Sequence, residues 1–215
     1  MPKATSLQGI TAVAFVDRLL PGVESLRAAL PEHTLLLLLD PQVEGLTQIA
    51  TALSGFQGLQ AIHLFTHGAP GSLSLGNSRV DIDHLASDAA ELQAIGAALA
   101  EEGGLLLYGC AVAQGAPGQA FIEALALATG ADVAASTNAT GPALLGGDWQ
   151  LEAASGTIEA AAVVPDAQTW AAGLLYSFQQ LAPSNAVSFP LVTSCAACQP
   201  RHSAKLRPTG SQISR

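Results

Sequence analysis

The sequence predicts an α/β protein with a mostly parallel sheet, helices on both faces and two small β-hairpins. Short apolar runs alternate with stretches of helical periodicity, an order typical of parallel strands joined by helical crossovers. We expect the strand order 2-1-3-4-5, which places the third strand beside the fourth. The runs expected to be strands are residues 12–17, 34–39, 61–67, 105–109 and 131–136.

Proline, glycine and aspartate mark the ends of the segments between these strands, where helices are expected. The apolar stripe of the third helix extends to Leu99. Residues 76–78 form the loop of the first hairpin, and residues 148–151 and 156–160 are the two strands of the second. The four helices are bounded by Pro21 and Pro31, Asp40 and Gly55, Asp83 and Gly103, and Pro117 and Gly130.

The 215 residues are enough for one domain with an aliphatic core, because 49% are hydrophobic and only 5% are aromatic. Residues 1–175 hold all 17 acidic residues and four basic ones, whereas residues 176–215 hold four basic residues and no acidic one. We therefore expect a loose N-terminus at residues 1–11, one domain at residues 12–175 and a disordered basic tail at residues 176–215. The acidic body argues against nucleic acid as a partner.

The chain shows neither a secretory signal peptide nor the run of roughly 18 apolar residues that a membrane span requires. Its three cysteines do not form a disulfide framework. Cys195 and Cys198, followed by His202, have the spacing of half a zinc site, but a fourth ligand is missing. We expect no metal and no cofactor, and the oligomeric state is not indicated.

A histidine and a cysteine end the third and fourth expected strands. Ligands of open α/β sheets bind at the carboxyl ends of the strands, and neighbouring strands lie about 4.8 Å apart. His67 and Cys110 therefore face one crevice, where an imidazole can convert a thiol to the nucleophilic thiolate. The alternative is a histidine that hydrogen-bonds a turn and a small buried thiol. His63 is expected in the core or behind the site.

An apolar run ending in His67-Gly68, a hairpin, a helix and a second run ending in Gly109-Cys110 resemble the signature of the caspase-like cysteine peptidases of clan CD. Within that clan the chain resembles the bacterial CHAT type. It is most similar to domain-of-unknown-function family 4347, which is found in long repeat-rich bacterial surface proteins. The resemblance covers roughly residues 12–172 and includes no clear specificity-pocket motif. The segments that carry it are residues 13–17, 66–71, 107–110 and 146–149.

The resemblance implies a three-layer caspase-like fold and a cysteine peptidase, which is a hydrolase. His67 would be the general base and Cys110 the nucleophile. The backbone N–H groups of Gly68 and Cys110 would form the oxyanion hole. The substrate would be a peptide or protein, either a partner or a linked segment of the same polypeptide. The resemblance also implies an extracellular or cell-surface location, and a cytoplasmic one stays open.

Asp17, Asp40 and Tyr108 stand near the same rim and are the candidates for substrate binding. The alternative for the two aspartates is the capping of a turn or helix. Asp148 and Trp149 are expected to form a structural corner, with Trp149 on the core. The competing function is a catalytically silent binding or structural module of a large bacterial surface or adhesin-like protein, because fold does not fix function.

Overall fold

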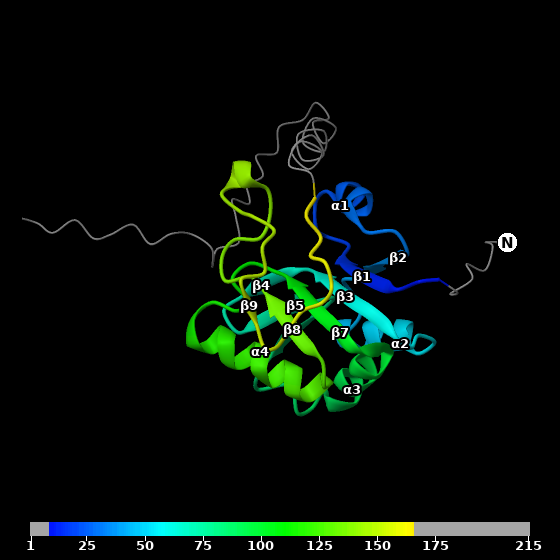
Figure 1. Cartoon of the computed structure of the whole chain (residues 1–215). Coiled ribbons are helices and arrows are strands. Elements are labelled where there is room, and N and C mark those ends of the chain that lie inside the picture. Colours follow the sequence, from blue (N-terminus) through cyan, green and yellow to red (C-terminus); the bar gives the residue numbers. More distant parts are fainter. Residues whose placement is uncertain (1–8, 166–215) are drawn as a thin grey trace, which may run out of the picture.

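The structure, a computed structural model, describes residues 9–165 and contains one large and one small sheet (Figure 1). The large sheet has the order β2-β1-β3-β7-β8-β9, and the small one is antiparallel with the order β4-β5-β6. The predicted strand order is confirmed, and β9 adds a short antiparallel strand at one edge. The strands are β1 (Ala12–Asp17), β2 (Thr34–Leu39), β3 (Leu59–Phe65), β4 (His67–Ala69), β5 (Ser72–Leu75), β6 (Ser78–Asp81), β7 (Leu99–Tyr108), β8 (Asp132–Ala135) and β9 (Ala153–Ala154).

Helices cover both faces of the large sheet, as the sequence predicts. α2, α3 and α4 lie on one face, and α1 lies on the other together with residues 158–163 (Figure 1). Each face therefore encloses its own cluster of buried apolar side chains. The helices are α1 (Val23–Ala29), α2 (Gly45–Leu53), α3 (Ala89–Ala98) and α4 (Gly115–Thr129), with a short 3₁₀ turn at Ala143–Leu145.

Strand β1, which lies second from the edge of the large sheet, is buried on both faces. All six of its residues are buried. Val13 and Phe15 belong to the cluster under the three helices, while Ala14 and Val16 belong to the cluster under α1. A strand buried on both faces needs apolar side chains, which accounts for the continuous apolar run of its first five residues.

Two helices begin later than the sequence predicts. α2 begins at Gly45, because the Glu44 carboxylate caps it by accepting hydrogen bonds from the amides of Leu46 and Thr47. Asp40 instead closes a local turn, in which its carboxylate accepts from the Gln42 amide at 2.9 Å. Side-chain acceptors favour turns as well as helix starts, so the two uses are not distinguished by sequence alone.

The third helix also starts later than expected, at Ala89 and not after Asp83. The intervening residues 82–88 form consecutive turns, with the Ser87 and Asp88 amides both donating to the His84 carbonyl. Leu85 is buried within these turns and still contributes to the core.

Strand β7 is longer than predicted, and Leu99 lies in it, not on the third helix. Leu99 pairs with Leu59, and the pairing changes register before Ala61 meets Gly104. A Cβ atom at Gly103 would lie 2.6 Å from the Leu59 carbonyl oxygen. The glycine pair therefore marks an irregularity inside a strand, where two backbones approach closely, and not a helix end.

The second predicted hairpin, from residues 148–151 and 156–160, does not form. Residues 153 and 154 pair with β8, and the Ser155 hydroxyl accepts from the Val133 amide. The first hairpin is present as β5 and β6, with a third strand, β4, that the sequence analysis did not predict.

His63 is a buried histidine in the middle of β3. It is 1% exposed, its ring lies 6.0 Å from that of Tyr108, and its Nδ1 has no hydrogen-bond partner among the described residues. Burial disfavours the charged ring and lowers the pKa of His63 from 6.5 to about 4. The placement of His63 in the core is therefore confirmed.

We predict that His63 makes the fold sensitive to mild acid. The unfolded chain takes up the proton near pH 6.5 and the folded chain only near pH 4, so stability falls as the pH drops through this window. Between about pH 7 and pH 5 the wild type should lose about 2 kcal/mol more than His63→Leu in urea unfolding. His33→Asn, at an exposed histidine, is the control and should follow the wild type. Equal losses for wild type and His63→Leu would contradict the prediction.

Candidate active site

The site lies where the neighbouring strands β3 and β7 end. Phe65 pairs with Tyr108, and the Thr66 amide still donates to the Tyr108 carbonyl at 3.2 Å. The two segments that leave these strands therefore start side by side. His67 follows as the first residue of β4 and is exposed, and Cys110 follows β7 and is partly buried. Sequence analysis had expected His67 to be the last residue of the third strand.

Gly68 presses its backbone against the segment that carries the cysteine. A Cβ atom at Gly68 would lie 2.9 Å from the Cys110 carbonyl oxygen and 2.5 Å from a Val112 methyl group. A Cβ atom at Gly109 would lie 3.3 Å from the Gly68 nitrogen. Glycine at position 68 is thus required for this approach, and position 109 leaves little room for a side chain, so the segments of His67 and Cys110 lie in backbone contact.

Two further contacts fix the strand that begins with His67. The Thr66 hydroxyl donates to the Ser74 carbonyl, which ties the end of β3 to the small sheet. The Gly71 amide donates to the Val112 carbonyl at 2.9 Å, two residues beyond Cys110. The small sheet is therefore hydrogen-bonded both to the end of β3, which precedes His67, and to the segment that follows Cys110.

The turn after Cys110 has an unusual backbone. Ala111 has φ 57°, in the left-handed region that costs roughly 1–2 kcal/mol for a residue with a side chain. Its amide donates to the Asn138 carbonyl at 2.6 Å, and the Ala113 amide donates to the Ser136 carbonyl at 2.9 Å. These hydrogen bonds to the end of β8 hold the turn in its strained form.

A loop over residues 138–148, called the cover loop below, contacts the thiol. The Cys110 Sγ donates to the Thr140 carbonyl at 3.8 Å. The base of this loop is held by the Asn138 amide group, which donates to the carboxylates of Asp148 at 3.0 Å and Glu152 at 2.7 Å. The loop therefore contributes to the partial burial of Cys110.

Sequence analysis missed Asn138, although it connects the cysteine turn to the cover loop. The available signal was its position just past the fifth strand, at the rim where open α/β sheets place functional residues. Its two carboxylate partners come from 10 and 14 residues further along the chain, so no short motif contains the group.

The two aspartates proposed for substrate binding act as local caps. Asp17 is 4% exposed, and its carboxylate accepts from the Leu19 amide at 2.9 Å. Asp40 receives the Gln42 amide in the turn described above. With strands about 4.8 Å apart, Asp17 lies about 10 Å and Asp40 about 14 Å across the sheet from the end of β7. Both carboxylates thus make the local backbone contacts expected of residues that cap a turn.

Tyr108 lies in the core and not on an open rim. It is 2% exposed, its ring stacks on Phe65 at 4.3 Å, and its hydroxyl accepts a 2.7 Å hydrogen bond from the Val163 amide. Burial raises the pKa of Tyr108 well above its usual value, so the hydroxyl stays protonated. Trp149 packs near both rings, which agrees with the predicted structural corner.

Among residues 9–165, no group of three or more histidine, cysteine, aspartate or glutamate side chains is arranged to hold a metal ion. No helix in this part of the chain is long and apolar enough to cross a bilayer. Cys195, Cys198 and His202, considered above as half a zinc site, lie outside the described residues, as does the tail of residues 176–215.

A family model described as a domain of unknown function, DUF4347, matches residues 13–174. The chain belongs to this family. No curated protein and no solved structure matches the chain significantly. The DUF4347 match spans both strands that end at His67 and Cys110 and the cover loop, so all parts of the candidate site belong to the family domain.

We predict that Gly68→Ala strongly disturbs this DUF4347 domain. The added methyl group would overlap the Cys110 carbonyl and Val112, so the substitution should destabilise the fold by about 1–3 kcal/mol. Gly104→Ala in β7 is the matched control, because its methyl group would make ordinary contacts of 3.5 Å or more. Urea unfolding measures both. A Gly68→Ala variant as stable as Gly104→Ala would show that the backbone contact is absent.

Proposed function

We propose that this domain is a caspase-like cysteine peptidase that uses His67 and Cys110 as a catalytic pair. The observation that carries the proposal is the backbone contact of Gly68 with Gly109 and Cys110. It supports a shared site, because it leaves the residues that carry the imidazole and the thiol at the same rim of the sheet. The DUF4347 family itself assigns no activity.

The chemistry follows from these two side chains. The His67 imidazole takes the thiol proton, and the thiolate attacks the carbonyl carbon of a peptide bond. A C–S bond forms while the carbonyl electron pair moves to oxygen, near the Gly68 and Cys110 backbone that the resemblance assigns as an oxyanion hole. The C–N bond then breaks, and the leaving amine takes the proton from the imidazolium. Water hydrolyses the thioester and restores the thiol.

A hollow beside the cover loop supports a peptide as the substrate. It has a volume of about 450 Å³, and Asp148 and Trp149 are among the residues that line it. A carboxylate beside an indole ring suits a long cationic side chain. Val164 and Pro165 also line this hollow, so the polypeptide continues from there. The substrate can therefore be a linked segment of the same polypeptide as well as a separate protein.

A second function is favoured by one specific contact. The Cys110 thiol donates to the Thr140 carbonyl, and a thiol that serves as a donor is protonated and unreactive. With the cover loop closed, the domain would be a catalytically silent binding or structural module of a large bacterial surface or adhesin-like protein. As part of such a surface protein, the domain would have the proposed extracellular or cell-surface location.

Thiol alkylation measured against pH separates the two functions. The chain is prepared with Cys195→Ser and Cys198→Ser, so that Cys110 is the one cysteine left. Because an imidazolium stabilises a nearby thiolate, the rate at about pH 6.5 should be about tenfold higher than in His67→Ala. His84→Ala removes another exposed histidine, from the turn after β6, and should behave like the wild type.

Circular dichroism and urea unfolding should show that His67→Ala keeps its fold, because the side chain that it removes is exposed. Superimposable alkylation curves for wild type and His67→Ala would mean that the imidazole does not activate the thiol. The silent module would then be the preferred function.

A further inference from the structure

Strand β2 forms an outer edge of the large sheet and is only partly covered. It pairs with β1 on one side, and no strand among the described residues pairs with its other side. Its sequence is one threonine followed by five leucines, without a charge. Leu38 is 39% exposed, and only Leu39 is fully buried. An uncovered strand edge leaves alternate N–H and C=O groups without a ladder partner.

β2 also lacks the features by which proteins protect such an edge. Protected edges carry lysine, proline or a bulge, or are very short. β2 has none of these, and all six of its residues pair with β1 in unbroken register from Thr34 to Leu39. A straight, uncharged and apolar edge is the structure that accepts a further strand.

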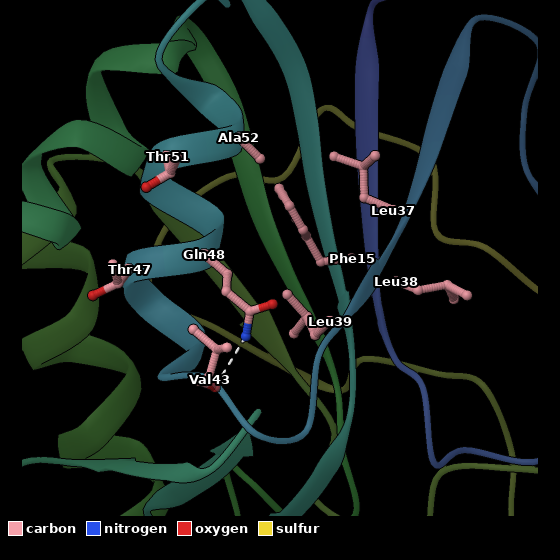
Figure 2. Close-up of a pocket in the computed structure, with 9 residues that line it drawn as sticks. All are labelled: Phe15, Leu37, Leu38, Leu39, Val43, Thr47, Gln48, Thr51 and Ala52. Atoms are coloured by element: carbon pink, nitrogen blue, oxygen red, sulfur yellow. Dashed lines mark hydrogen bonds between the residues drawn. The ribbon is translucent and has the colours of Figure 1, made fainter. Parts of the chain in front are cut away.

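A hollow beside this edge supplies room for side chains. Figure 2 shows it between α2 and the end of the sheet, where Phe15, Leu37 and Leu39 point toward the helix and Leu38 points away. Its volume is about 440 Å³. Val43, at its lower end in the view, is 44% exposed. The hollow is thus an apolar strip that runs along the inner side of an open edge.

We propose that the open edge of β2 is a docking site for residues 187–192 of the same chain, which add a further strand to the sheet. The docking involves neither His67 nor Cys110, so it does not depend on the proposed catalytic function. The expected looseness of the tail is compatible with it, because a segment without a core of its own can order on an existing edge.

The sequence of residues 187–192 fits an outer strand. Apolar Val187, Phe189 and Leu191 alternate with Ser188 and Pro190, so the three apolar side chains share one face and can cover the hollow. In a strand, the N–H groups of successive residues point to opposite edges. If the N–H groups of Val187, Phe189 and Leu191 point to β2, the nitrogen of Pro190 faces the outer, solvent-exposed edge. Proline has no N–H, so no hydrogen bond to β2 is lost, and the new outer edge is protected against a further strand.

Charge favours the basic tail, which contains this uncharged segment, over a second copy of the acidic chain. Residues 1–175 hold 17 acidic and four basic residues, whereas residues 176–215 hold four basic and no acidic ones. Two copies paired antiparallel through β2 would bring Glu32 of one copy near Asp40 of the other at both ends. The 21 residues between Pro165 and Val187 can extend about 70 Å, more than enough to reach β2.

Amide hydrogen exchange of residues 34–39, measured in the full chain, tests the docking. Phe189→Asp combined with Leu191→Asp places two charges in the docked face and should release the segment. We expect the β2 amides to exchange at least about tenfold faster in this variant than in the wild type. The matched control is Gln179→Asp with Gln180→Asp, which adds the same charge to the tail outside the segment and should keep the wild-type rate.

The amides of α4 serve as the internal control, because no α4 residue lines the hollow beside β2. Unchanged exchange of these amides in every variant shows that the fold is intact. Equal and fast β2 exchange in all proteins would show that the edge is open and would overturn the proposal. Equal and slow exchange that speeds up on dilution would assign the edge to a second copy. Equal and slow exchange at every concentration would assign it to another part of the chain, and both results also overturn the proposal.

Discussion

The contact between two glycine backbones is the constraint on which the candidate site depends. β3 and β7 are parallel neighbours, so their last residues leave the sheet at the same rim. Because Gly68 lacks a side chain and packs closely on Gly109, the histidine segment can lie directly on the cysteine segment. The small sheet then fixes this approach through the hydrogen bond from Gly71 to Val112. A residue with a Cβ atom at position 68 would separate the two segments.

The surroundings of Cys110 act in two opposing ways. The strained turn at Ala111 and the hydrogen bonds to Asn138 and Ser136 hold the thiol in one place, as a nucleophile requires. The same thiol donates a hydrogen bond to the Thr140 carbonyl of the cover loop, a contact that a reactive thiolate could not make. In the proposed peptidase, the loop would move or a substrate would replace the carbonyl contact. In the proposed silent module, the contact would stay. The two proposals therefore differ in what they expect of the cover loop.

The sequence predicted the parts of the structure that depend on local patterns. Continuous apolar runs located the strands, and their ends located His67 and Cys110. The starts of α2 and α3 were wrong, because Asp40 and Asp83 signal a turn as well as a helix start. The sequence predicts a helix end at the glycine pair of residues 103 and 104, although this pair lies inside β7. Asn138 and the buried position of Tyr108 rest on contacts between distant segments, which no local pattern contains.

The most direct test of the central claim is whether the His67 ring lies beside the Cys110 sulfur. NMR can compare the ring signals of His67 at one fixed pH in the wild type and in Cys110→Ser, with exposed His33 as the internal reference. Ring chemical shifts respond to atoms within a few ångströms, so the substitution should move the His67 signals and leave the His33 signals in place. Unchanged His67 signals would contradict the account, because a ring beside the sulfur senses its replacement.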